Sequence, residues 1–322
     1  MKAYFFLCES NDGWRNLAAD EYFLNHIGKD EILLYIYINA PAVIIGKNQN
    51  AWRECNLKAM EADGVKLVRR ISGGGAVYHD LGNVNFSFIA HRDIYDVSRQ
   101  MNVILRSVRE LGIQAEFSGR NDLLAEGKKF SGNAFCVRGE GRQHHGTLLL
   151  SADLSKLPGY LNVSDAKLKS KGVSSVRSRV CNLCEFNAEI TNESMIEALK
   201  KGFAQEYGDF QNWELDAAAR EEIEALYEKQ SSWQWRLGQT PRFDLELKNR
   251  FDWGEIQVLL SFKQAHVSEV QVYSDALDTE IAEQLAQMLQ GARFTAKDLA
   301  AAVLPEKKEL EEIAGWLGSL EY

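Results

Sequence analysis

Three polar clusters in this 322-residue chain contain the residue types best suited to chemistry. The first is RRISGGGAVYHD, residues 69–80, with three adjacent glycines between two arginines and a His-Asp pair. The second combines GRNDLL, residues 119–124, with the paired lysines of KKFSGNAF, residues 128–135. The third combines HHGTLLL, residues 144–150, with the basic stretch KGVSSVRSRV, residues 171–180. Arginine and lysine commonly bind carboxylates and phosphates, so the clusters favour an anionic ligand, although each alone is also typical of an exposed charged turn.

The glycine loop does not match two common phosphate-binding motifs. No Lys-Ser or Lys-Thr follows Gly75, as a Walker loop requires, and no helix opens after the glycines, as a dinucleotide fingerprint requires. The stretches VKLVRR before the loop and AVYHDLGNVNFSFIA after it are strand-like, so the loop joins strand to strand. A helix N-terminus is therefore not expected to receive a phosphate here. A glycine-rich hairpin without a ligand is the simpler interpretation, but the flanking arginines favour a ligand.

Composition limits the class of protein. The formal net charge of −9 gives no support for a nucleic-acid partner. The longest apolar stretch, ILLYIYINAPAVIIG, is too short and too interrupted for a membrane span, so no membrane association is expected. The five cysteines are an odd number in a large chain, which indicates a cytoplasmic protein.

The cysteines and histidines do not predict a zinc site. Cys181 and Cys184 form a single C-x-x-C without a second pair. His144 and His145 are adjacent in a strand-like stretch, where neighbouring side chains point to opposite faces. Two histidines placed in this way do not easily bind one metal ion.

The elements that must position the clusters form an α+β pattern. Asp12 is expected to cap a first helix, and a strong apolar stripe closed by Gly112 predicts another. A hairpin is expected to turn near Glu126-Gly127, just before the paired lysines. The predicted helices cover 12–28, 52–64, 94–112, 192–207 and 216–230, and the predicted strands include 31–39, 42–47 and 144–154.

A domain boundary is expected near RLGQTPRFD, where Gly238 and Pro241 interrupt the chain. Two strand-like runs and three helical ones follow it, which predicts a small α+β unit. We therefore expect one domain at residues 1–243 and a smaller one at 244–322.

Taken together and in this order, the motifs closely resemble the lipoate–protein ligases of the long bacterial type. The resemblance rests on RRISGGGAVYHDLGN, SGRNDLL, KKFSGNAF, HHGTLLL, KGVSSVRSRV and KQSSWQW, and it extends to the C-terminal domain. It implies a mixed-sheet catalytic domain of the biotin/lipoate ligase type with a smaller C-terminal α+β accessory domain. It also implies an enzyme that uses ATP and Mg²⁺ to adenylate lipoate, and then passes the lipoyl group to a lysine of a carrier domain.

The resemblance implies a catalytic role for Lys129, because a fixed cation lowers the repulsion between a carboxylate and the α-phosphate. Asp122 is expected to orient Lys129 or to hold Mg²⁺. Strand alternation would put Lys129, Ser131 and Asn133 on one face. The stretch LLAEGK that follows Asp122 is shorter than in some members of the family.

The remaining binding residues also follow from the resemblance. The strands around Phe86 and Phe88, with the first helix, are expected to line an apolar slot for the lipoyl tail. The expected adenylate contacts are Arg70, Gly75, Ala76, Val77, Tyr78, Asp122 and Lys129, and the expected lipoate contacts are Ser72, Gly74, Gly75, Lys129 and His145.

The implied protein partners are the lipoyl domains of 2-oxoacid dehydrogenase complexes and the glycine-cleavage carrier protein, and a monomer is expected. Three alternatives remain. An octanoyl or lipoyl transferase would use a cysteine in a P-C-G context, which is absent around Cys136, Cys181 and Cys184. A biotin ligase would carry G-R-G-R-x-G, which RRISGGG lacks. A protein that binds lipoate without activating it would not form AMP.

Overall fold

A computed structural model of the chain describes residues 1–118, 122–161, 180–237, 244–263 and 265–320. The residues group into two compact units. The first unit comprises Met1–Ile44, Trp52–Arg69 and Ala76–Arg236. The second unit comprises Ile45–Ala51, Arg70–Gly75 and Leu237–Tyr322. Two short segments from the N-terminal part of the chain, one of them the glycine loop, therefore pack with the C-terminal residues.

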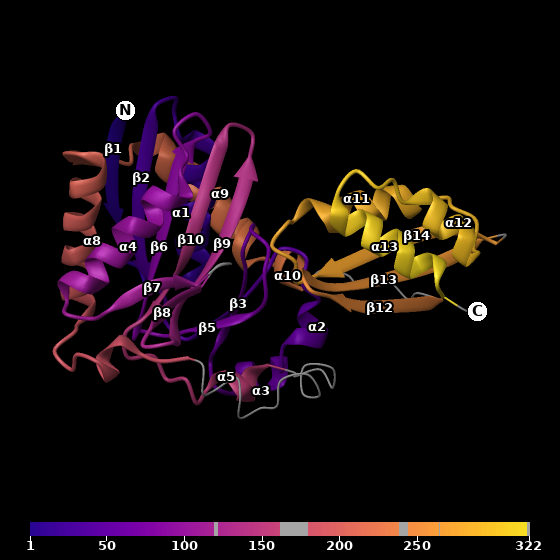
Figure 1. Ribbon diagram of the computed structural model, residues 1–322, viewed down its shortest axis with the longest axis horizontal. Coiled ribbons are helices and arrows are strands. Elements are labelled where there is room, and N and C mark those ends of the chain that lie inside the picture. Colours follow the sequence, from indigo (N-terminus) through magenta and orange to yellow (C-terminus); the bar gives the residue numbers. More distant parts are fainter. Residues whose placement is uncertain (119–121, 162–179, 238–243, 264, 321–322) are drawn as a thin grey trace. The chain divides into compact units, whose positions relative to one another are not determined.

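The first unit is built on an eight-stranded mixed sheet with the strand order β11-β1-β2-β6-β10-β9-β8-β7 (Figure 1). Strand β1 pairs in parallel with β2 and β11, and the other neighbours are antiparallel. The strands are β1 Lys2–Leu7, β2 Glu31–Ile38, β6 Asn83–His91, β7 Ala115–Ser118, β8 Asp122–Ala125, β9 Lys128–Arg138, β10 Gly141–Leu149 and β11 Phe210–Asn212. The mixed sheet expected from the sequence is confirmed.

Helices cover both faces of this sheet (Figure 1). Helices α4 (Val97–Glu110) and α8 (Asn192–Tyr207) enclose an apolar core with one face, and Phe86 and Phe88 are fully buried there. Helices α1 (Gly13–His26) and α9 (Ala217–Ser231) belong to the other face. The side chains of Phe86 and Phe88 fill the α4/α8 core, and the apolar slot expected between the strands around them and the first helix stays a prediction.

Local signals in the sequence explain where several elements begin and end. The Asp12 carboxylate accepts a hydrogen bond from Trp14 N at 3.0 Å and caps α1, as expected. Gly112, with φ of +82°, follows the end of α4. The β8–β9 hairpin turns at Glu126 and Gly127, which both have positive φ, so this expectation is also confirmed.

Residues 52–64 do not form the single helix that was expected. They form parts of α2 (Ala51–Glu54) and α3 (Leu57–Ala62), with Asn56 between them. The Asn56 side chain caps α3 by accepting from Ala59 N at 3.2 Å, and it therefore starts a new helix. The short elements β3 (Ala42–Ile45), β4 (Lys66–Arg69) and β5 (Val77–His79) form a second small sheet. Within the described residues, the other short helices of this unit are α5 Leu157–Tyr160, η1 Leu183–Glu185 and α10 Trp233–Arg236.

The second unit has an antiparallel three-stranded sheet of β12 (Leu245–Phe251), β13 (Gly254–Lys263) and β14 (His266–Ser274). Helices α11 (Glu280–Leu289), α12 (Ala296–Ala302) and α13 (Lys308–Gly318) pack on it around a shared apolar core (Figure 1). The two strands and three helices predicted for this region are confirmed, and β12 was not anticipated. The expected boundary residues Gly238 and Pro241 lie outside the described residues. Among the residues described, no helix has the length and apolar character needed to cross a membrane.

Candidate active site

Lys129 lies next to a β-bulge that decides which face of the sheet it occupies. In the β8–β9 pairing, Ser131 is opposite Leu123 and Lys129 is opposite Leu124, so Phe130 is one extra residue. Leu123 and Phe130 belong to the α4/α8 core, and Ser131 is fully buried. Residues directly opposite each other share a face. The expectation that Lys129 and Ser131 share a face is therefore wrong, because the extra residue reverses the alternation between them.

Asn133 is also not on the face of Lys129. Its side-chain oxygen lies 2.9 Å from His144 Nε2, and His144 Nδ1 lies 3.1 Å from Gln100 of α4. Burial lowers the pKa of His144 to about 3, so the ring is neutral. The Asn133–His144 pair ties β9 and β10 to α4 and does not present polar atoms to a substrate at Lys129.

The Lys129 ammonium is held by the carboxylate of Asp122. Lys129 Nζ lies 2.6 Å from Asp122 Oδ1, and each side chain is about one-third exposed. Asp122 pairs across the strands with Gly132, where a Cβ would lie 3.1 Å from Lys129 Nζ. The missing side chain at Gly132 leaves space for the ammonium. The site therefore presents an oriented and accessible cation, which can stabilise charge developing on a carboxylate or a phosphate.

His145 lies on the same face of the sheet as Lys129. It is directly opposite Ala134 of β9 and Ser87 of β6. Ala134 and Gly132 are two residues apart and share a face. Lys129, Asp122 and His145, three residues expected from the sequence, are therefore brought to one face of one sheet.

Sequence reasoning missed the buried polar residues of β6 on this face. Asn83 Nδ2 donates to Asn85 Oδ1 at 2.9 Å, and Asn85 Nδ2 donates to Tyr37 O at 3.2 Å. The signal was present in the sequence, since Asn83, Asn85 and Ser87 recur at every second position of the apolar stretch NVNFSF. Strand β6 is buried on both faces but carries polar side chains on one of them. This pattern indicates that the polar face has a role beyond hydrophobic packing.

Asp20 of α1 is a buried carboxyl group beside these polar residues. Burial raises its pKa to about 7, and nearby Glu21 adds to the rise, whereas Ser87 and Gln143 act to lower it. Gln143 Nε2 also donates to Ser87 Oγ at 2.9 Å. Sequence reasoning did not single out Asp20, because an aspartate within a helical pattern is usually exposed.

The raised pKa of Asp20 predicts a pH-dependent cost in stability. The pKa of Asp20 is higher in the folded state than in the unfolded state. Its contribution to the free energy of unfolding is therefore greatest below about pH 4 and is lost as the pH rises through 7. Replacing Asp20 by Asn should raise the free energy of unfolding above pH 7 by about 2–4 kcal/mol and remove this slope between pH 4 and 7. Urea unfolding of both proteins across that range measures the difference. An unchanged slope in the Asn variant would contradict the raised pKa.

The three loop glycines have different surroundings in the second unit. A Cβ at Gly73 would overlap the backbone oxygens of Ala276 and Leu277. Gly74 has φ of +93°, which disfavours side chains, and its N–H donates to Ala276 O at 2.9 Å. A Cβ at Gly75 would have no heavy atom within 4 Å. The first two glycines are therefore needed for packing and backbone conformation, whereas Gly75 faces open space.

Arg70 holds the glycine loop itself. Its Nη2 donates to Gly73 O at 2.6 Å and to Gly75 O at 2.8 Å, and its Nε donates to Gly73 O at 3.0 Å. Ser72 is fully buried, and its carbonyl accepts from Lys47 N at 2.8 Å. The contacts of Arg70 and Ser72 with a nucleotide or lipoate stay predictions.

Ala76, Val77 and Tyr78 continue the chain into the first unit. Val77 and Tyr78 form the start of β5, with Val77 exposed and Tyr78 partly buried beside the ring of Tyr160. The adenylate contacts expected in this segment therefore fall into two groups, with Arg70 and Gly75 in the second unit and Ala76, Val77 and Tyr78 in the first.

Asp122 is the residue that was expected to bind Mg²⁺. Within the described parts of the chain, no cluster of three or more His, Cys, Asp or Glu side chains is arranged to hold a metal ion. Mg²⁺ is commonly bound through one or two protein carboxylates together with substrate phosphates. The one-third exposed carboxylate of Asp122 is an oxygen donor of that type, so it fits a metal that arrives with a nucleotide.

The cysteine nearest to Lys129 is unsuited to nucleophilic attack. Cys181 N donates to Lys129 O at 2.9 Å, so the segment runs beside β9. Burial raises the pKa of the Cys181 thiol to about 11, and the thiol is therefore protonated at neutral pH. The rest of the basic motif, residues 171–179, lies outside the described residues, as do Gly119, Arg120 and Asn121 of the second cluster.

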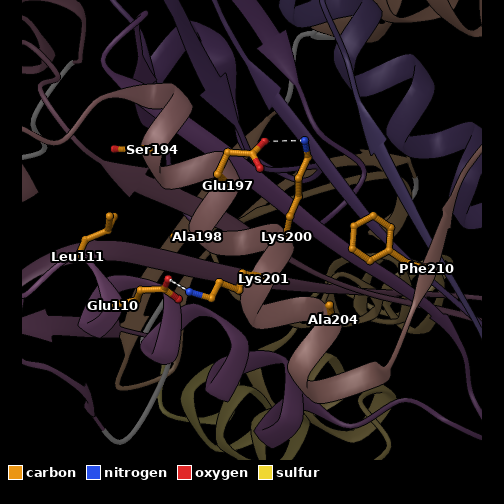
Figure 2. Close-up of a pocket in the computed structure, with 9 residues that line it drawn as sticks. All are labelled: Glu110, Leu111, Ser194, Glu197, Ala198, Lys200, Lys201, Ala204 and Phe210. Carbon is orange, nitrogen blue, oxygen red and sulfur yellow. Dashed lines mark hydrogen bonds and ion pairs between the residues drawn. The ribbon is translucent and has the colours of Figure 1, made fainter.

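A surface pocket between α4 and α8 contains none of the expected site residues (Figure 2). Its charged side chains pair with each other, Lys200 with Glu197 at 2.7 Å and Lys201 with Glu110. The pocket is therefore not a candidate for the chemistry of Lys129. The lining residues are Glu110, Leu111, Ser194, Glu197, Ala198, Lys200, Lys201, Ala204 and Phe210.

Known proteins resemble the chain along nearly its whole length. Residues 12–204 match the lipoyl protein ligase A/B catalytic domain, and residues 240–317 match the bacterial lipoate protein ligase C-terminus. A lipoate-protein ligase A from Psychrobacter cryohalolentis is 39% identical over 325 residues, which cover 96% of each chain.

Solved structures show the same fold. The LipL1 protein of P. falciparum, in complex with lipoate, is 29% identical with a TM-score of 0.86, covering 99% of this chain and 100% of its own. A bipartite lipoate protein ligase of Thermoplasma acidophilum, studied with its E2 lipoyl domain, is 30% identical with a TM-score of 0.68, covering 76% and 100%. A lipoate-protein ligase A bound with ATP is 29% identical with a TM-score of 0.65, covering 74% and 99%.

The resemblance expected from the motifs is therefore confirmed by sequence matches to both domains and by the shared fold. A paired and accessible lysine lies on the sheet in the segment KKFSGNAF, which carried much of that resemblance. The chain belongs to the lipoate–protein ligase family.

Proposed function

We propose that the chain is an ATP-dependent lipoate–protein ligase whose activation chemistry takes place at Lys129. The observation that carries this proposal is the Lys129–Asp122 pair, with Nζ 2.6 Å from Oδ1 and both side chains accessible. An oriented cation is what a reaction between two anions requires. One related protein is named a lipoate-protein ligase A, and related structures contain bound lipoate or bound ATP; these relatives support the same reaction.

The first half-reaction joins the lipoate carboxylate to the α-phosphate of ATP. A carboxylate oxygen attacks the α-phosphorus, the bond from that phosphorus to the bridging oxygen breaks, and pyrophosphate leaves with the bonding electrons. The Lys129 ammonium reduces the repulsion between the reacting anions, and Asp122 keeps it in place. Asp122 would also give one oxygen to Mg²⁺, which would neutralise charge on the phosphate oxygens.

The glycine loop and the polar sheet face supply the binding groups. We assign the open side of Gly75 to the adenylate, because a ligand can approach the backbone closely there. Arg70 orients the loop through its bonds to two loop carbonyls. The other proposed adenylate contacts are Ala76, Val77 and Tyr78, and the other proposed lipoate contacts are Ser72, Gly74 and His145.

The second half-reaction transfers the lipoyl group to a protein. The neutral amine of a carrier lysine attacks the acyl carbon of lipoyl-AMP, the bond to the phosphate oxygen breaks, AMP leaves and the amine loses a proton. The proposed carriers are lipoyl domains of 2-oxoacid dehydrogenase complexes and the glycine-cleavage carrier protein. The pairing of the Thermoplasma ligase with an E2 lipoyl domain supports this class of partner.

The same proposal covers the organisation of the protein. Residues 1–243 would be the catalytic domain and residues 244–322 the accessory domain, consistent with family matches at 12–204 and 240–317. We further propose a monomer in the cytoplasm, where the five free cysteines would stay reduced.

The test measures the products of both half-reactions. The protein is incubated with ATP labelled at the α-phosphate and with lipoate, octanoate or biotin in turn, and the acyl-adenylate and pyrophosphate are measured. Addition of an apo lipoyl domain should then release AMP and increase the mass of the domain by one lipoyl group. Formation of biotinyl-AMP alone, or acyl transfer without ATP, would contradict the proposal.

The cysteines are expected to be dispensable. Replacing Cys136, Cys181 and Cys184 together by alanine should leave ATP-dependent lipoylation within about threefold of wild type, because Cys181 is protonated and Cys136 is buried. Loss of acyl transfer in a folded triple variant would favour the thiol transferase.

A further inference from the structure

The motif KQSSWQW has no role in the chemistry described above, yet it ends where the chain leaves the first unit. Helix α10 (Trp233–Arg236) is the last element of the first unit before Leu237. Strand β4 (Lys66–Arg69) likewise ends at the last residue of the first unit before Arg70 and the glycine loop. Two of the points at which the chain passes between units are therefore marked by Arg69 and Arg236.

Arg69 and Trp235 bind each other's backbone. Arg69 Nε donates to Trp235 O at 2.9 Å, and Arg69 Nη2 donates to Arg236 O at 2.8 Å. In return, Trp235 Nε1 donates to Arg69 O at 2.9 Å. Arg69 is almost fully buried and Trp235 is half-buried, so these bonds are partly shielded from water. The guanidinium satisfies two carbonyls at the end of a helix, where intrahelical donors are lacking.

The orientation of the Trp235 ring is itself fixed by charged groups. Lys229 Nζ lies 4.2 Å from the centre of the ring, and it also binds Glu21 Oε1 at 2.7 Å. Arg138 of β9 binds the same carboxylate at 2.6 Å. Burial alone would raise the pKa of Glu21, but Lys229 and Arg138 outweigh it and lower the pKa, so Glu21 is ionised at neutral pH. A charged network thus extends from the strand of Lys129 to Trp235.

We propose that Trp235 is a positioning residue for lipoate activation, acting through Arg69 on the glycine loop. The three bonds fix the backbone at Arg69, and Arg70, whose guanidinium holds the carbonyls of Gly73 and Gly75, is the next residue. Without these three hydrogen bonds, the loop would adopt the conformation that accepts the adenylate less often. The apparent affinity for the adenylate would fall in proportion to the population of that conformation. This inference rests on the proposed adenylation activity.

The test compares two single variants of the full chain, their combination and a control variant. Trp235→Phe keeps an aromatic ring for Lys229 but removes the N–H donor, and Arg69→Lys keeps the charge but loses the paired donation to two carbonyls. Trp233→Phe is the matched control, because Trp233 lies on the same helix and is about half exposed. Each protein is assayed for lipoyl-AMP formation, for binding of a non-hydrolysable lipoyl-AMP analogue, and for thermal stability.

Trp235→Phe and Arg69→Lys should each lower kcat/KM for lipoyl-AMP formation about tenfold, equivalent to about 1.4 kcal/mol. Binding of the analogue should weaken to a similar degree, and amide hydrogen exchange at residues 71–76 should become faster. Because both changes break the same set of hydrogen bonds, the double variant should lose little more activity than either single variant. The control should match wild type in every assay.

Two results would overturn the proposal. In one, Trp235→Phe melts at a lower temperature while its folded fraction binds the analogue and forms lipoyl-AMP normally, so Trp235 would be structural only. In the other, the losses of the two single variants add fully in the double variant. If wild type itself forms no lipoyl-AMP, the proposed function fails instead, and the exchange rates at residues 71–76 still report whether Trp235 orders the loop.

Discussion

Replacement of Lys129 by alanine is expected to lower the rate of lipoyl-AMP formation about 100- to 1000-fold, the range seen when one preorganised group at a developing charge is removed. The fold should persist, because the Lys129 side chain is one-third exposed and lies outside the apolar core, so its removal leaves no core cavity. Single-turnover measurement of lipoyl-AMP, with a thermal melt of the same sample, separates the two effects.

Lys128→Ala is the matched control for this variant. Lys128 is the neighbouring lysine, about half exposed, and its ammonium pairs with Glu185 at 3.7 Å instead of Asp122. Its removal should leave activation within about threefold of wild type, because an exposed charge has little effect at a distance. Near-normal activation in the Lys129 variant, or equal losses in both variants, would show that the oriented ammonium is not the catalytic group.

Replacement of Gly75 by valine should lower activation about 100-fold and leave the melting temperature nearly unchanged. A side chain at this position meets no heavy atom of the protein within 4 Å, and φ lies outside the left-handed region, so valine is tolerated by the fold. The same side chain would occupy the space proposed for the adenylate, and a small displacement of reacting groups costs about that factor.

Gly73→Val provides the opposite comparison. Its side chain would overlap the backbone of Ala276 and Leu277, so the expected result is a lower melting temperature of the second unit. Measuring stability and lipoyl-AMP formation for both variants distinguishes a ligand-binding glycine from a packing one. If the Gly75 variant activates lipoate normally, the loop is only a turn and the nucleotide binds elsewhere.

Much of the fold could be predicted because its signals are local. Each of these signals depends on residues that are close together in the sequence, as in the apolar stripe of α4, the cap at Asp12 and the turn at Glu126-Gly127. The split of residues 52–64 into two helices was missed, since the capping by Asn56 competes with a continuous helical pattern. The motifs likewise identified Lys129 and Asp122, which the structure places together.

The rest could not be predicted because it depends on backbone contacts between distant segments. Gly74 donates to the carbonyl of Ala276, and Gly73 lies against the carbonyl oxygens of Ala276 and Leu277. Every residue type has such groups, so no sequence pattern shows the contact. For the same reason, the sequence did not show that residues 45–51 and 70–75 pack with the C-terminal residues. The buried Asp20 was missed because its surroundings come from two other strands.

The extra residue in β9 decides which face of the sheet the Lys129 side chain occupies. If the bulge were absent and Phe130 paired directly with Leu124, Lys129 would lie opposite Ala125 and its side chain would turn toward the apolar core, although every letter of the motif would remain. A homologue that keeps the letters but lacks the bulge would thus present a different surface. A designer who transplants this site onto an idealised sheet must therefore copy an irregularity of the backbone together with the side chains.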